Sequence, residues 1–207
     1  MYSIKEIYKT IQGEGAQSGK SAVFVRFSGC NLWSGKEKHR DDSICKFCDT
    51  DFVGTDGING GKYSAVTLIS KIKEIWDSDE EGYIVFTGGE PMLQLDEELI
   101  ISCKKANFLT ALETNGTIKI DFDIDWVCVS PKAGSNLLVN KGNELKVVYP
   151  QPEFDLKSFE KLHFDHFFLQ PMDSKNKIIN TENAIKYCLK NPKWKLSIQQ
   201  HKILGID

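Results

Sequence analysis

Short apolar segments that each end in a polar cluster place the strongest limit on the fold. The expected strands cover residues 21–27, 83–86, 108–112, 126–129, 145–148, 166–169 and 196–199. In the first of them, Val23, Val25 and Phe27 alternate with Phe24 and Arg26, which is the period-two pattern of a strand with two different faces. Helical patterns lie between several of these strands. Strands that alternate with helices predict an α/β fold with a parallel sheet.

Helical periodicity marks the segments 64–76, 96–107, 154–162 and 181–189, and Ser64 is the expected N-cap of the first. The faces expected to point inward are formed by Val66, Ile69, Ile72, Ile75 and Trp76 in the first helix, by Leu99, Ile100 and Cys103 in the second, and by Ala184, Ile185 and Cys188 in the last. Cys103, Cys128 and Cys188 are expected to be ordinary buried residues.

The polar clusters follow the predicted strands and are not scattered. In barrels and in open α/β sheets, the carboxyl ends of the strands carry the ligand site. We therefore expect one rim to collect Cys30, the segments 87–90, 113–115, 130–132 and 170–173, and His201.

Length and charge exclude several other classes of protein. The 207 residues are enough for one sizeable core, and we expect one domain over 1–207. A formal net charge of −3 offers no positive surface to nucleic acid or to an anionic membrane, so neither partner is expected. No apolar run approaches the length of a membrane span, and the first residues do not read as a signal peptide. Six cysteines without a secretory signal predict a reducing compartment, the cytoplasm.

Cys30, Cys45 and Cys48 are the most specific chemical feature of the chain. Fourteen residues separate the first two, and two residues separate the last two. Thiolates are soft ligands, and a C-x-x-C pair can bind one soft metal centre from a single turn. Three thiolates leave one iron of a 4Fe–4S cluster without a protein ligand, and chemistry can occur there. Two alternatives remain open from the cysteines alone: a structural zinc site with His39 as fourth ligand, and a redox pair.

A glycine-rich loop follows the predicted strand 83–86. Gly88 and Gly89 lack a Cβ atom and permit close approach of the backbone to a ligand. Glu90 offers a carboxylate to a ligand ammonium group, and Pro91 stiffens the turn. Most such loops are only turns, but this one follows a strand and has the three cysteines upstream, so it indicates a ligand site.

The cysteine set and the segment 87–91 resemble the radical S-adenosylmethionine (SAM) superfamily. That superfamily usually has three residues between the first two cysteines, where this chain has fourteen. The longer spacing resembles that of one family, the 7-carboxy-7-deazaguanine synthases (QueE). This family includes forms with an enlarged cluster loop, which would cover about 31–61 in this chain. The similarity also covers 10–15, 26–33, 47–51, 130–132, 144–146 and 170–173, so it runs nearly end to end.

The resemblance implies a modified, incomplete radical SAM (β/α) barrel that works as a homodimer. It implies a lyase that converts 6-carboxytetrahydropterin to 7-carboxy-7-deazaguanine with loss of ammonia, on the route to queuosine and related deazapurines. Cys30, Cys45 and Cys48 would hold a 4Fe–4S cluster, SAM would bind its open iron, and a donor such as flavodoxin would reduce it. Mg²⁺ would bind Thr50, whose hydroxyl lies beside two aspartates.

The same resemblance assigns further residues. SAM would be contacted by Phe47, Asp49, Gly89, Glu90, Ser130, Pro131, Lys132, Gln170, Pro171, Met172 and Asp173. The pterin would be contacted by Ile11, Gln12, Gly13, Glu14, Arg26, Thr87, His201 and Asp207. Without the resemblance, Arg26 reads as a surface charge, Glu14 as a turn carboxylate and His201 as a satisfied core or surface histidine.

Two expectations concern segments rich in charge or near the end of the chain. The run 36–42 is expected to be a solvated face. Ile203, Leu204 and Ile206 give the last segment a reason to dock, and the main-chain carboxylate of Asp207 is expected to bind the substrate, as in the relatives it resembles. Two other functions remain open: a radical SAM enzyme for another substrate, such as a glycyl-radical activase, and a non-enzymatic zinc-binding module.

Overall fold

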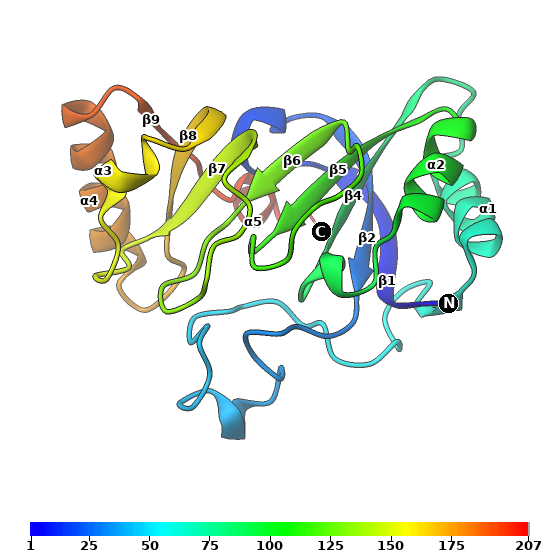
Figure 1. The fold of residues 1–207 in the computed structure, drawn as a ribbon, viewed down its shortest axis with the longest axis horizontal. Coiled ribbons are helices and arrows are strands. Elements are labelled where there is room, and N and C mark those ends of the chain that lie inside the picture. Colours follow the sequence, from blue (N-terminus) through cyan, green and yellow to red (C-terminus); the bar gives the residue numbers. More distant parts are fainter. Residues whose placement is uncertain (207) are drawn as a thin grey trace.

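A nine-stranded sheet runs through the computed structural model, which describes residues 1–206 (Figure 1). The strands lie in the order β3-β1-β2-β4-β5-β6-β7-β8-β9. Their bounds are β1 Tyr2–Ile11, β2 Ser21–Phe27, β3 Gly61–Tyr63, β4 Gly82–Gly88, β5 Phe108–Thr114, β6 Trp126–Val129, β7 Lys141–Tyr149, β8 His163–Pro171 and β9 Trp194–Leu196. From β2 and β4 to β9 every neighbouring pair is parallel, as the alternation of strands and helices predicts.

The antiparallel edge of the sheet was not predicted. β1 pairs antiparallel with both β2 and β3. A register irregularity between Ile4 and Glu6 interrupts β1, so its side chains lose the regular period-two pattern that marks a strand. The three residues of β3 are too few to carry any pattern.

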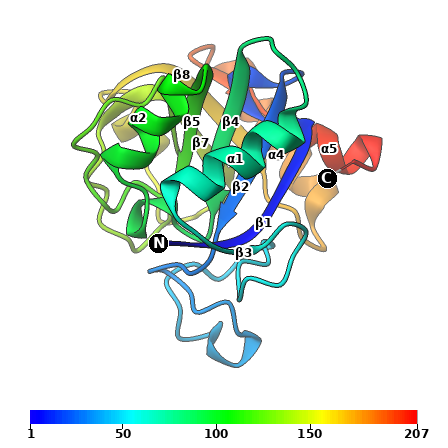
Figure 2. The ribbon, with the colours of Figure 1, turned by 90° about the vertical axis from the view of Figure 1, so that its right-hand side faces the viewer.

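Helices cover one face of the sheet (Figures 1 and 2). The α-helices are α1 Ala65–Trp76, α2 Glu97–Lys105, α3 Leu156–Phe159, α4 Lys177–Lys190 and α5 Gln200–Leu204, and the short 3-10 helices are η1 Gly15–Gln17, η2 Glu37–His39 and η3 Pro91–Leu93. α1 and α2 pack on the half of the sheet around β2 and β4, and α3 and α4 pack on the half around β7 and β8. The sheet curves around its other face (Figure 2), which is left for the site, and the fold is an incomplete barrel.

The N-cap of α1 is confirmed, but its predicted buried face is partly wrong. Ser64 accepts a hydrogen bond from the Thr67 N–H in a capping box. The buried face holds Leu68 and Ile72, whereas Val66 is 76% exposed. Most of the predicted residues are spaced three apart. Because a helical turn takes about 3.6 residues, this spacing moves gradually around the helix and away from the buried face.

The inward faces of the other two helices are partly confirmed. Leu99, Ile100 and Cys103 are buried in α2, as expected. Of the three residues expected to face inward in α4, only Ala184 is buried, because Ile185 is 39% exposed and Cys188 is half-buried. Among the described residues, no helix has the length and apolar character needed to cross a membrane.

The segment between β2 and β3 projects beyond the end of the sheet (Figures 1 and 2). Most of the charged run within it is exposed, as predicted, with Arg40 as the half-buried exception. The predicted strand 196–199 lies too late, because β9 ends at Leu196 and is soon followed by α5. Ile203 and Leu204 are 70% and 63% exposed, so the expected docking of these two side chains is wrong.

Candidate active site

A cavity of about 530 Å³ lies at the carboxyl ends of the parallel strands. This is a normal size and place for a small-molecule site in an α/β protein. Most of the predicted site residues line it: Ile11, Gln12, Gly13, Glu14, Arg26, Cys30, Cys45, Phe47, Cys48, Asp49, Thr50, Thr87, Gly89, Ser130, Lys132, Gln170, Pro171, Met172, Asp173 and His201. Glu90 and Pro131 are buried outside this lining, Ile206 belongs to it, and Asp207 lies outside the described residues.

The three cysteines enter this cavity from two segments. Cys30 follows β2, and its Sγ accepts a hydrogen bond of 3.4 Å from the Leu32 N–H. The N–H groups of Ile44 and Cys45 both donate to the Leu32 carbonyl, at 3.2 and 3.3 Å, which brings the C-x-x-C turn back to the first cysteine. Burial raises the pKa of the Cys30 and Cys45 thiols. Metal binding would therefore have to displace protons from these thiols.

The three cysteines could belong to a zinc site or to a 4Fe–4S cluster. Within residues 1–206, no three side chains of His, Cys, Asp or Glu are grouped as ligands of a single metal ion. His39 is exposed and its Nδ1 lies 2.8 Å from the Ser34 Oγ, so it gives no support to the zinc alternative. A cubane cluster instead places each thiolate on a different iron. The Trp33 Nε1–H, in the same wall, is buried and makes no hydrogen bond among the described residues, and a cluster sulfur could accept it.

The glycine-rich loop packs directly on the first cysteine. A Cβ atom added to Gly89 would lie 2.1 Å from the Gly29 carbonyl oxygen and 2.8 Å from the Cys30 Cβ. The Glu90 N–H donates to the same Gly29 carbonyl at 2.9 Å. Glycine is therefore needed at position 89 for the contact between the two loops, in addition to any contact with a ligand.

Glu90 is completely buried, and its carboxylate already has protein partners. It accepts hydrogen bonds from the Thr114 hydroxyl and the Asn115 N–H, both at 2.7 Å, and from the Met92 N–H at 3.0 Å. Burial raises the pKa of Glu90, although these donors act in the opposite direction. In this structure Glu90 joins the ends of β4 and β5, and its contact with SAM stays a prediction.

A buried ion network forms the opposite wall. Lys146 extends from β7 with its side chain 4% exposed, and its Nζ lies 2.8 Å from Glu14 and 3.0 Å from Glu113. Burial alone would raise the pKa of Glu14, but Lys146 outweighs it and lowers that pKa to about 2. Burial raises the pKa of Glu113, which Lys146 offsets only in part. No role was predicted for Lys146 or Glu113, although a lone lysine in an apolar strand is a visible signal.

The loop that carries Glu14 is held by several side chains. Gln170 and Gln199 each donate to the Glu14 carboxylate at 3.0 Å, and the Ala16 N–H donates to Glu144 at 2.9 Å. Gly15 has φ +65°, and a Cβ there would lie 2.0 Å from a carboxylate oxygen of Glu144. The loop is therefore fixed before any ligand binds.

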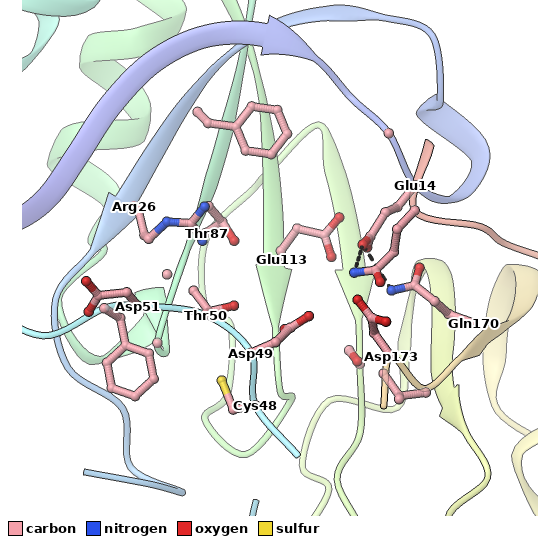
Figure 3. A pocket seen from close by; sticks show the side chains of 18 of the residues that line it. Glu14, Arg26, Cys48, Asp49, Thr50, Asp51, Thr87, Glu113, Gln170 and Asp173 are labelled. Atoms are coloured by element: carbon pink, nitrogen blue, oxygen red, sulfur yellow. Dashed lines mark hydrogen bonds between the residues drawn. The ribbon is translucent and has the colours of Figure 1, made fainter. Parts of the chain in front are cut away.

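The remaining polar groups surround the open part of the cavity (Figure 3). Arg26 and Thr87 lie on one side, Glu14 and Gln170 on the other, and Glu113 lies between them. The Arg26 side chain is held at 2.7 Å by Glu6 and at 2.8 Å by the Tyr8 hydroxyl.

Both aspartates beside Thr50 already have cationic partners. Asp51 lies 2.9 Å from the Nζ of Lys5, and Asp49 lies 2.6 Å from the Nζ of Lys202. Lys202 also lies 2.5 Å from Asp173, so α5 is joined to both the cysteine segment and the end of β8. Burial lowers the pKa of the neighbouring His201.

Comparison with known proteins gave a consistent set of relatives. No family model matches the chain. The chain is 54% identical over 207 residues to a 7-carboxy-7-deazaguanine synthase of Bradyrhizobium diazoefficiens and 53% identical to one of Burkholderia multivorans, with 99% of both chains covered in each case. Among solved structures, QueE from Escherichia coli matches with a TM-score of 0.75 and 26% identity, over 96% of this chain and 93% of that one.

Proposed function

The chain belongs to the 7-carboxy-7-deazaguanine synthase family, and we propose that it converts 6-carboxytetrahydropterin to 7-carboxy-7-deazaguanine with loss of ammonia. One observation carries this proposal. A relative that is 54% identical over 99% of the chain is named 7-carboxy-7-deazaguanine synthase, and in this chain the three cysteines line one cavity together with the polar residues at the strand ends. On this proposal the chain is a radical SAM lyase of deazapurine biosynthesis. It has one domain over 1–207 and a cluster loop at about 31–61.

Cys30, Cys45 and Cys48 would hold a 4Fe–4S cluster. The cluster and SAM, when bound, supply the radical chemistry. The protein contributes buried thiols, backbone N–H groups directed at Cys30, and the Gly89 backbone packed against that cysteine. These groups would hold the cluster next to the segments proposed to bind SAM, which include Ser130, Lys132 and 170–173.

Lys132 is well placed among these groups. Its Nζ donates to the Ser130 carbonyl and hydroxyl oxygens at 2.6 and 2.8 Å. Burial lowers the pKa of Lys132, while the nearby Cys45 thiol acts in the opposite direction. A buried cation close to a thiolate favours the deprotonated sulfur that iron requires.

The substrate would bind against the acidic wall. Pterin amino and ring N–H groups are donors, and the carboxylates of Glu14 and Glu113 are charged acceptors, which form the stronger class of hydrogen bond. Lys146 pairs with both carboxylates and holds them in place before the substrate arrives. Gln12 joins this wall through its Nε2, which lies 3.5 Å from Glu113. On the other side, Arg26 and Thr87 face the same space, and they would complete the pterin site.

Five further features belong to the same proposal. Mg²⁺ would bind at the Thr50 hydroxyl and bridge to the substrate, because it rarely occupies an all-protein cage. The chain would work as a homodimer and take electrons from a donor such as flavodoxin. Its free thiols suit the reducing cytoplasm. The main-chain carboxylate of Asp207 would complete the substrate contacts.

Anaerobic turnover tests the proposal. The reconstituted protein is incubated with SAM, a chemical reductant and 6-carboxytetrahydropterin, and the product is identified by mass and absorbance. We expect 7-carboxy-7-deazaguanine only when all three are present. SAM cleavage without this product would leave a radical SAM enzyme of another substrate class, and a colourless protein that holds only zinc would contradict the cluster as well.

A further inference from the structure

Arg40 departs from the solvated charged run in which it lies. Its side chain is 24% exposed, compared with 75% for Glu37 in the same run. The guanidinium carbon lies 3.9 Å from the centre of the Trp33 ring. From the same group, Nη1 donates to the carbonyl oxygens of Lys46 and Cys48, at 3.1 and 3.2 Å.

These contacts join the two halves of the cysteine segment. Trp33 lies three positions after Cys30, and the two carbonyl groups belong to the C-x-x-C turn. A guanidinium is planar, so its face can stack on an aromatic ring while its N–H groups bond in the plane. Arg40 is therefore a side-chain bridge between the first cysteine and the other two, in addition to the backbone hydrogen bonds at the Leu32 carbonyl.

Glu37 orients the guanidinium. Its carboxylate accepts a hydrogen bond of 2.7 Å from Nε and a second one from Nη2, which leaves Nη1 directed at the turn. Nε and Nη2 therefore bond to Glu37, and Nη1 bonds to the C-x-x-C turn. The flat face of the guanidinium packs on the Trp33 ring. A lysine could supply the charge but not these contacts together.

We propose that Arg40 is a positioning residue of the cluster loop. Its side chain holds the Trp33 side chain and the C-x-x-C turn at the spacing that a cluster requires. The inference rests on the cluster of the proposed function and not on the identity of the substrate. Groups around the ligands of a metal centre commonly change its affinity by about tenfold to a hundredfold when they are altered. Arg40 acts on the ligand backbone and need not contact the cluster.

The test compares Arg40→Lys, Arg40→Gln and Lys38→Gln after anaerobic reconstitution. Lys38 is an exposed cation of the same run and serves as the matched control. The first measurement is the rate of iron release to a chelator. We expect this rate to rise about tenfold or more in both Arg40 variants and to stay unchanged in Lys38→Gln. Far-ultraviolet circular dichroism confirms that each variant is folded.

The second measurement is the midpoint potential of the cluster, followed by electron paramagnetic resonance. Loss of a positive charge disfavours the more negative, reduced cluster, so Arg40→Gln should have a lower potential than Arg40→Lys. Iron release from Arg40→Lys at the wild-type rate would overturn the inference, because the charge alone would then suffice. Equal acceleration in Lys38→Gln would overturn it too. A wild-type protein that takes up no cluster would overturn the proposed function, and the inference with it.

Discussion

The two sides of the cavity are built in different ways. On the sheet side, Lys146 is 4% exposed and lies between two carboxylates, and its own strand β7 is paired with both β6 and β8. On the loop side, the segment that carries the cysteines has only the short helix η2 and is held by individual side chains. Arg40 holds it from within, and Lys5 holds it from β1 through Asp51 and Asp56, at 2.9 and 2.8 Å.

The difference shows which part needs a cofactor to be complete. The sheet side has Lys146 paired with two carboxylates, so it is an acceptor surface that is already formed without a ligand. The loop side has thiols whose pKa is raised by burial, and an indole N–H that finds no partner within residues 1–206. A ligand that binds the thiolates and accepts a hydrogen bond from the indole N–H would stabilise the loop, because the free energy of binding also stabilises the ordered loop. Changes on the two sides should therefore have separable effects.

The largest effect is expected at the cysteines. Replacement of Cys30, Cys45 or Cys48 by alanine should abolish the proposed cluster and reduce SAM cleavage to background, because each thiolate would bind a different iron. Iron and sulfide content and SAM cleavage are measured after anaerobic reconstitution. The unfolding of the metal-free protein should change little, since the sheet side is untouched.

His39→Ala is the control for this series. His39 bonds to Ser34 and does not line the cavity, so the variant should keep its cluster. Full cleavage activity in any cysteine variant, or cluster loss in His39→Ala, would contradict the assignment of three thiolates and no fourth protein ligand.

On the sheet side, Lys146→Met should be strongly destabilising. It leaves Glu14 and Glu113 buried without their cation, and removal of one partner from a buried ion pair costs about 3–5 kcal/mol. The free energy of unfolding is measured by urea titration at neutral pH. Lys190→Met, an exposed lysine at the end of α4, should cost little by comparison. Equal losses in the two variants would show that the network contributes nothing of its own.

The same network predicts a pH dependence. The pKa of Glu14 falls from its usual 4.5 to about 2 in the folded chain, so the unfolded chain binds the proton more tightly. The stabilisation is therefore fully present above about pH 4.5 and disappears as the pH falls toward 2, and it is on the order of 3 kcal/mol. Glu14→Gln should lose stability at pH 6 and much less at pH 3. An equal difference at both values would mean that Glu14 is not held by Lys146.

Much of the site could be predicted from the sequence, because it follows from strand periodicity. Val23, Val25 and Phe27 do face the helices, and Phe24 and Arg26 do face the cavity. Once the sheet is parallel, every polar cluster after a strand must reach the same edge. The rim was therefore predictable without any knowledge of side-chain contacts.

The rest depended on which residues become neighbours in space. The partners of Lys146 come from the loop after β1 and from β5, and no local pattern relates those segments. Arg40 lies in a charged run whose composition predicts exposure, and only the fold of the loop places it over Trp33. The antiparallel β1 was missed because its register shift removes the alternation on which strand prediction rests.

A smaller effect is expected from Thr50→Val, which tests the proposed magnesium site on the loop side. The two neighbouring aspartates are already paired with lysines, so the Thr50 hydroxyl is the side-chain oxygen left for the ion. Valine keeps the shape and removes that oxygen. We expect magnesium to stimulate turnover of the wild-type protein and to stimulate the variant severalfold less, with unchanged cluster content. Equal turnover with and without a chelator of Mg²⁺ would argue against the site.

The smallest effect is expected from Lys202→Met, which releases α5 from both sides of the cavity. Lys202 lies 2.6 Å from Asp49 on the loop and 2.5 Å from Asp173 at the end of β8, and its side chain is 31% exposed. Pairs this open contribute about 0.2–1 kcal/mol each and weaken as salt is added. The variant should therefore raise the Michaelis constants of SAM and substrate about two- to fivefold at low salt, with cluster content unchanged.

Salt separates this contact from a merely structural one. High salt should bring the wild-type Michaelis constants toward those of Lys202→Met and should leave the variant nearly unchanged, because the two ion pairs are what the salt screens. Lys190→Met, distant from the cavity lining, should follow the wild type at both salt concentrations. Equal Michaelis constants for Lys202→Met and the wild type at low salt would mean that α5 is held by its backbone contacts, such as the Gln200 N–H to the Gly13 carbonyl at 3.0 Å, and not by Lys202.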